Sequence, residues 1–102
     1  MEKFIDKYPN NYLGNLVKAL MDYNKAIELK PDYYEAYFNR GVTFYNMGHY
    51  EKAILDLHKA IELNPNEAEY YDTRKEVYEA MGESEKAAQD LETYNKLKEK
   101  ES

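Results

Sequence analysis

The chain has no cysteine and no tryptophan, and it lacks any long apolar run. Without cysteine it forms no disulfide and offers no thiolate as nucleophile or zinc ligand. No stretch approaches the roughly 18 consecutive apolar residues of a membrane-spanning helix, and the first residues lack the apolar segment of a signal peptide. We therefore expect a cytoplasmic chain that does not enter a membrane.

Positive charge is also scarce. The chain has 14 lysines and arginines but 20 aspartates and glutamates, which gives a net charge of −6. Nucleic acids and anionic membranes bind basic surfaces, so this balance disfavours both as partners. We expect a protein or peptide partner, although plain solubility also accounts for the acidic surface.

Many residues recur with a period of 34 along the 102-residue chain. A fixed period of this length predicts an array of repeats, and three copies are about the minimum that buries a shared core. The recurring sets are Gly14, Gly48 and Gly82; Lys18, Lys52 and Lys86; Ala19, Ala53 and Ala87; Asp22, Asp56 and Asp90; and the pairs Pro31 and Pro65, Tyr37 and Tyr71, and Arg40 and Arg74.

The second and third copies each predict two helices joined by a glycine turn. Apolar residues at steps of three and four predict helices from about Tyr33, with Asp32 as its N-cap, to Met47, and from about Tyr50 to Leu63. Gly48 ends the first of these because glycine accepts the left-handed backbone of a helix end. The third copy repeats this plan over 68–100, with its turn at 81–83.

The first copy is irregular. A helix is predicted from about Leu16 to Leu29, but only 1–13 precede it, and they contain Pro9. A proline inside a helix removes a hydrogen bond and clashes with the preceding turn. We expect at most a short helix before Pro9, followed by irregular backbone through Asn11.

The middle copy resembles the tetratricopeptide repeat, with small and aromatic residues in the family's order at Tyr37, Gly41, Phe44, Ala53, Leu57, Ala60 and Pro65. The resemblance implies an all-α fold, a right-handed superhelical solenoid of antiparallel helix hairpins in a single domain over 1–102. The repeats would cover about 1–33, with an incomplete first helix, then 34–67 and 68–102. It also implies a protein–protein interaction module without catalysis.

In the family, the first helix of each repeat lines a concave groove that binds peptides. Carried over by position, the implied groove residues are Glu35, Phe38, Asn39, Val42, Tyr45 and Asn46 in the second repeat, and Glu69, Asp72, Thr73 and Glu76 in the third. The acidic residues lie beside aromatic ones, which favours a peptide with basic and apolar residues. The alternative is that these carboxylates form only a solvated face.

The sequence carries no catalytic motif. It has no phosphate-binding loop or nucleophile elbow, and its two histidines, His49 and His58, do not have metal-ligand spacing. We expect no enzyme, no cofactor and no metal.

Two alternatives concern the incomplete first repeat. Its second helix would leave Leu13, Leu16, Leu20 and Tyr23 exposed. Such an apolar end invites a second copy of the chain, by docking or helix exchange, to form a homo-oligomer. The other alternative is a fragment of a longer array whose preceding repeat covers this end.

Overall fold

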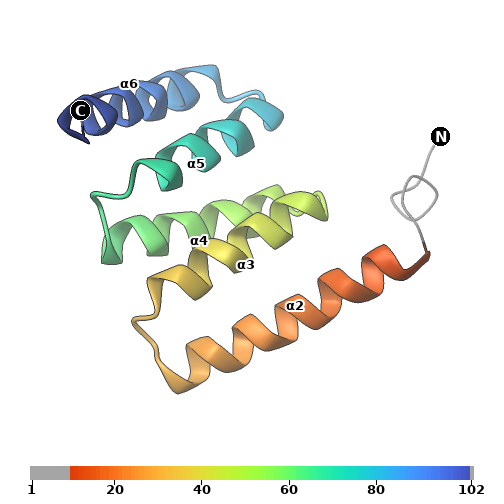
Figure 1. Cartoon of the computed structure of the whole chain (residues 1–102). Helices are drawn as coiled ribbons and strands as arrows, with labels where there is room; N and C mark the ends of the chain where they lie inside the picture. The colour runs from red at the N-terminus through yellow and green to blue at the C-terminus, as the bar shows by residue number, and fades with distance from the viewer. Residues whose placement is uncertain (1–9, 102) are drawn as a thin grey trace.

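The computed structural model describes residues 10–101, which form five α-helices and no strand (Figure 1). The helices are α2 (Asn10–Leu29), α3 (Tyr34–Asn46), α4 (Tyr50–Leu63), α5 (Ala68–Ala80) and α6 (Ser84–Glu101). The all-α fold predicted from the sequence is confirmed. For α3 to α6, the predicted boundaries agree with the observed ones to about one residue.

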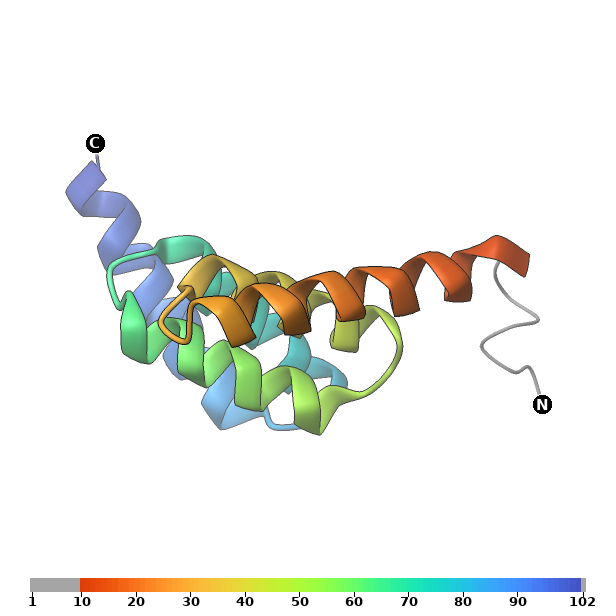
Figure 2. The same cartoon turned by 90° about the horizontal axis from the view of Figure 1, so that it is seen from below.

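Each helix runs antiparallel to the one before it, and the helices stack in chain order (Figures 1 and 2). The closest pairs are α3 with α4 and α5 with α6, which are the two predicted hairpins. Helix α2 packs against α3, and α4 packs against α5, so the hairpins form a continuous array.

The two hairpin turns share one geometry. Gly48 and Gly82 have φ angles of 79° and 78°, in the left-handed region that glycine adopts without a side-chain clash. The next residue closes each turn: the amide of His49 donates to the carbonyl of Phe44 at 2.8 Å, and that of Glu83 donates to Tyr78 at 2.9 Å. The predicted glycine turns are therefore confirmed.

The predicted cap of α3 is wrong. Tyr33, not Asp32, is the N-cap residue, and no side chain caps the helix. The backbone carbonyl of Tyr33 instead accepts hydrogen bonds from the amides of Ala36 and Tyr37, at 3.1 and 3.3 Å. Asp32 lies one residue too early, in the turn that precedes the helix.

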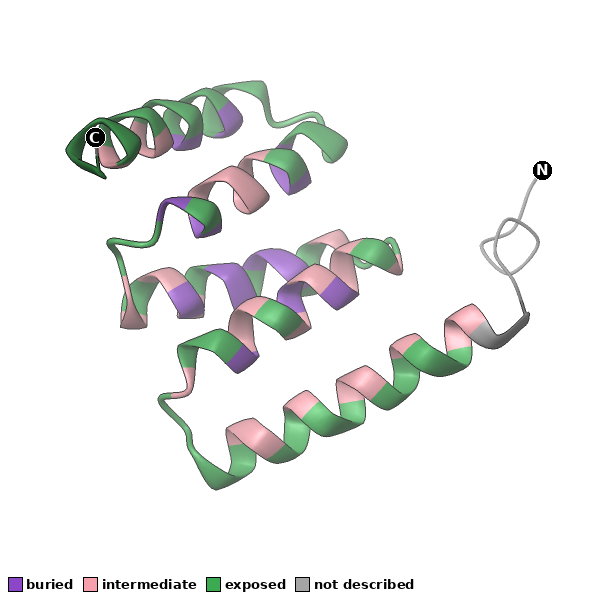
Figure 3. Cartoon of the chain, in the orientation of Figure 1, coloured by how far each residue is buried: buried purple, intermediate pink, exposed green. Residues whose placement is uncertain are grey.

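The core lies where the second hairpin meets the third (Figure 3). Leu57 of α4 and Val77 of α5 are the largest fully buried side chains. Gly41 allows α3 to approach α4 closely, because an added Cβ would lie 3.2 Å from Cγ of Leu57 and 3.3 Å from the carbonyl oxygen of Ala53. The buried apolar cluster comprises Ala53, Ile54, Leu57, Val77, Tyr78 and Ala87.

The first repeat differs from the prediction. Helix α2 begins at Asn10 rather than near Leu16, so Asn10 and Asn11 are helical, not irregular. Gly14 lies inside this helix, and positive φ angles among the described residues occur only at Gly48 and Gly82. Glycine weakens a helix without breaking it, by about 1 kcal/mol relative to alanine. The short helix predicted before Pro9 lies outside the described residues.

The N-terminal part of α2 extends past the end of α3 (Figures 1 and 2). Within residues 10–101, α2 has α3 as its neighbour, whereas α4 is enclosed between α3 and α5. Among these described residues, no helix covers the other side of α2.

Candidate functional site

Helices α3 and α5, the first helices of the second and third repeats, form a hollow of about 320 Å³ where they approach. Three carboxylates surround it, from α3, from α5 and from the linker before α5. The residues that line it are Glu35, Phe38, Asn39, Glu67, Glu69 and Tyr70.

Two stacked rings line this hollow. Phe38 and Tyr70 have ring centroids 4.6 Å apart and planes inclined by 24°. Such offset stacking stabilises the contact between the two helices beyond simple burial. Tyr70 is only 4% exposed, and Phe38 is half-buried. The hollow therefore combines apolar ring surface with acidic side chains.

The Tyr70 hydroxyl stays protonated at neutral pH. Burial, together with the negative charges of Glu67 and Glu35, raises the pKa of Tyr70 to about 12. Because these carboxylates make ionisation of the phenol unfavourable, they mark a region of negative potential beside the rings.

Four of the predicted groove residues lie together in this hollow: Glu35, Phe38, Asn39 and Glu69. Two lining residues, Glu67 and Tyr70, were missed. Tyr70 corresponds to Ala36, 34 residues earlier, and both residues are buried. A small residue at this position of the repeat indicates a place in the core rather than in the groove. Glu67 precedes α5, whereas the groove positions implied by the family lie on the first helix of each repeat.

The other predicted groove residues lie outside this hollow. Val42 and Thr73 are half-buried, and Asn46 is exposed. Asp72 pairs with Lys75 at 3.6 Å on its own helix. Burial, then the charges of Glu76 and Glu79, raises the pKa of Tyr45, which places Tyr45 near the acidic end of α5.

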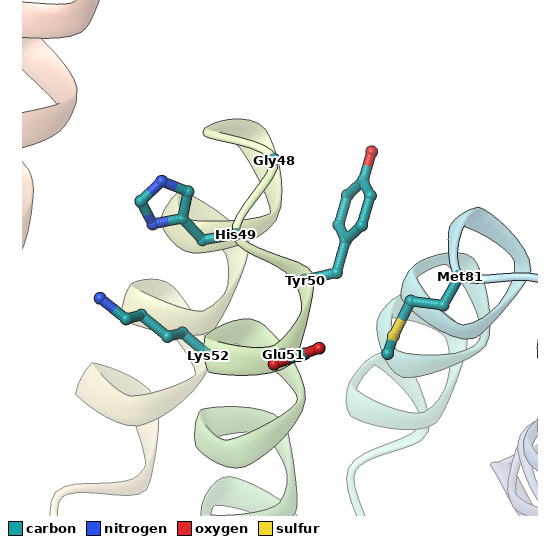
Figure 4. A pocket seen from close by; sticks show the side chains of 6 residues that line it. All are labelled: Gly48, His49, Tyr50, Glu51, Lys52 and Met81. Atoms are coloured by element: carbon teal, nitrogen blue, oxygen red, sulfur yellow. The ribbon is translucent and has the colours of Figure 1, made fainter.

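A second, larger hollow of about 490 Å³ lies at the hairpin turns (Figure 4). Tyr50, at the start of α4, and Met81, at the end of α5, belong to successive repeats and both line it. Its other lining residues are Gly48, His49, Glu51 and Lys52. Within residues 10–101, no group of three histidines or carboxylates could hold a metal ion here or elsewhere.

Arginine links neighbouring helices in the second repeat. Arg40 of α3 donates two hydrogen bonds to Asp56 of α4, at 2.8 and 2.7 Å. Its remaining nitrogen donates to Oδ1 of Asn24 in α2 at 2.9 Å. A bidentate pair of this kind is strong and directional. One side chain thus joins α3 to the helix on either side of it.

The third repeat contains the same arrangement. Arg74 donates to Asp90 at 2.8 and 2.6 Å, and its third nitrogen lies 3.0 Å from Nδ1 of His58. Arginine can only donate, so Nδ1 of His58 accepts and the ring is neutral. Partial burial and the charge of Arg74 both lower the pKa of His58, which agrees with a neutral ring.

This set of contacts, which we call the arginine ladder, comprises Arg40 with Asp56 and Asn24, and Arg74 with Asp90 and His58. The period of the arginines and aspartates is evident in the sequence, but their pairing was not predicted. Their constant separation of 16 residues was the available signal.

Comparison with known families agrees with this geometry. A model described as "Tetratricopeptide repeat" matches residues 34–67, and one described as "TPR repeat" matches residues 11–48. The chain belongs to the tetratricopeptide repeat family. Tetratricopeptide repeats generally bind protein partners and are typically non-enzymatic scaffolds, which supports a protein–protein interaction module.

Solved structures of MamA share the fold. "Crystal structure of MamA" has a TM-score of 0.83 at 26% identity, covering 89% of this chain and 54% of that one. "MamA MSR-1 C2" has a TM-score of 0.81 at 28% identity, covering 88% and 52%. The chain spans about half the length of these structures. No curated protein matches it.

None of the helices described by the structure is long and apolar enough to cross a membrane.

Proposed function

We propose that the groove between α3 and α5 binds a peptide segment of a partner protein that carries basic and apolar residues. The observation that supports this proposal is the hollow in which Glu35, Glu67 and Glu69 surround the stacked rings of Phe38 and Tyr70. An ammonium or guanidinium group of the peptide would form ion pairs with these carboxylates, and an apolar side chain would pack against the two rings.

The wider contact surface follows the same helices. Val42, Tyr45, Asn46, Asp72, Thr73 and Glu76 would extend the contact along the groove. Asn39 lies at the rim of the hollow with its side chain exposed, and its amide can hydrogen-bond an extended peptide backbone. A cytoplasmic location stays a prediction.

Titration of the chain with matched peptides tests this function. A peptide with alternating lysine and leucine should bind, and its glutamate counterpart should not. Replacing Glu35 and Glu69 together by glutamine should weaken binding several-fold, since each charge pair contributes about 0.5–1 kcal/mol. The variant in which Glu85 and Glu92 of α6 become glutamine loses the same charge and should bind normally. Equal binding of both peptides would refute the proposal.

Assembly through α2 is a second candidate function. Leu13, Leu16, Leu20 and Tyr23, which the sequence predicted to be exposed, are half-buried, whereas Leu29 is 73% exposed. The side of α2 away from α3 has no covering helix within residues 10–101. A second copy of the chain or another protein could cover it. Sedimentation at high protein concentration tests docking of a second copy, because a strict monomer argues against self-assembly.

A further inference from the structure

The face that α4 presents to its own hairpin partner is defined by three residues. A Cβ added at Gly41 of α3 would lie within 3.3 Å of atoms of Ala53, Asp56 and Leu57. These three residues are 0%, 5% and 0% exposed. They therefore mark where a first helix docks on a second helix.

The same positions in α2 are Ala19, Asp22 and Tyr23, each 34 residues earlier. Asp22 is exposed, and the other two are only half-buried. Leu29, seven residues after Asp22 and so on the same side of the helix, is exposed. Asp22 makes no ion pair within the described part of the chain. Within residues 10–101, no helix is docked on this hairpin face of α2.

Both complete hairpins show what such a helix must carry. Its arginine reaches the aspartate of the second helix, and a tyrosine three residues earlier lies under that arginine, at 5.6 Å in Tyr37–Arg40 and in Tyr71–Arg74.

An aromatic residue four positions after the arginine completes this set. The second helix places a lysine over its ring, with Lys52 at 5.6 Å from the Phe44 centroid and Lys86 at 5.7 Å from the Tyr78 centroid. Lys18 stands at the matching position of α2. The receiving half of the contact, Lys18 with Ala19 and Asp22, is therefore present in α2.

The sequence positions that correspond to such a docked helix do not carry this set of residues. At the positions 34 residues before Tyr37, Arg40 and Phe44, the sequence has Lys3, Asp6 and Asn10. In a second copy, Arg40 and Arg74 are already held by Asp56 and Asp90 at 2.6–2.8 Å. A second copy could offer an arginine only by opening one of its hairpins.

We propose that α2 receives an amphipathic helix from a different protein, with the pattern Tyr-x-x-Arg-x-x-x-aromatic. Its arginine forms a bidentate pair with Asp22, and its aromatic ring lies under Lys18. This docking completes the first hairpin in the way that α3 completes the contact with α4. The inference rests on assembly through α2, and it names the chemistry of the occupant.

A peptide with the sequence of residues 34–47 is a suitable probe, because it carries this pattern. We expect it to bind the full chain and to shift the amide signals of α2 around Asp22. Replacing its arginine by glutamine, or Asp22→Asn in the chain, should each weaken binding at least tenfold, since a desolvated charge pair is lost. The two changes together should weaken it little further. Asp32→Asn, at an exposed linker position, is the matched control.

Binding that is insensitive to Asp22→Asn would overturn the inference and leave assembly through α2 intact. Shifts confined to α4 would also overturn it, because the peptide would then be replacing α3. No binding, together with a monomer in sedimentation, would remove both the inference and the assembly function. A dimer of the chain that Asp22→Asn abolishes would mean that a second copy is the occupant, against the inference. Circular dichroism of each variant verifies that the fold is unchanged.

Discussion

Helices α2 and α4 hold the same place in successive repeats and carry related residues, but their surroundings differ. Helix α4 lies between α3 and α5, and its positions Ala53, Asp56 and Leu57 are buried. The matching positions of α2 are half-buried or exposed. The comparison shows that burial in this array comes from the neighbouring helices, whereas the pattern within a helix determines only which face can be covered.

The largest expected effect concerns a leucine that recurs in α4 and α6. Leu57→Ala should lower the free energy of unfolding by about 3 kcal/mol, because a fully buried side chain is removed and leaves a cavity. Leu91, 34 residues later, is 42% exposed, and Leu91→Ala should cost less than about 1 kcal/mol. Urea denaturation of both variants checks this difference. Equal losses would mean that an additional neighbour covers α6.

The aspartates should differ in the same way. Asp56→Asn weakens two charge-assisted hydrogen bonds to Arg40 and should cost about 2 kcal/mol. Asp22→Asn should change the stability by less than about 0.5 kcal/mol, because Asp22 is exposed. Thermal unfolding of the two variants makes the comparison. A large loss in Asp22→Asn would show that Asp22 is already paired within the chain.

The glycines should give effects of opposite sign. Gly48→Ala should destabilise the chain by about 1 kcal/mol, because its φ of 79° is strained for any residue with a Cβ. Gly14→Ala should stabilise it by about 0.5–1 kcal/mol, because Gly14 is helical and no atom lies within 4 Å of an added Cβ. If both destabilise equally, Gly14 forms a turn like Gly48.

The smallest effect on stability should come from the protonation of His58. The corresponding residue in the first repeat, 34 positions earlier, is Asn24. The folded state lowers the pKa of His58, so below pH 6.5 the unfolded chain binds the proton more readily. Stability should therefore fall as the pH drops from 7.5 to 5.5, by less than about 0.5 kcal/mol for this largely exposed ring. His58→Asn keeps an acceptor for Arg74 and should remove that fall. Urea titrations at both pH values test this, and an equal fall in the variant contradicts it.

Much of the fold could be predicted from the sequence because the signals are local. The glycine turns and the periodic apolar residues determined α3 to α6 almost to the residue. The start of α2 could not be predicted from the sequence. Gly14 occupies the position that forms the turn at Gly48 and Gly82, but Gly14 itself is helical. A glycine permits a left-handed backbone but does not require it, so the conformation depends on what packs around it.

The groove could be predicted only in part. Glu35, Phe38, Asn39 and Glu69 come together as the family pattern implies. Tyr70 was missed because its stack with Phe38 joins two repeats, and a period does not show which side chains meet across them. The arginine ladder was missed for the same reason.

Hydrogen exchange followed by mass spectrometry tests the contrast between α2 and α4 most directly. We predict that the amides of residues 53–63 in α4 exchange slowly, because the helix is enclosed on both sides, and that those of residues 13–20 in α2 exchange much faster. Protection of residues 13–20 equal to that of α4, in a chain that sediments as a monomer, would contradict the account.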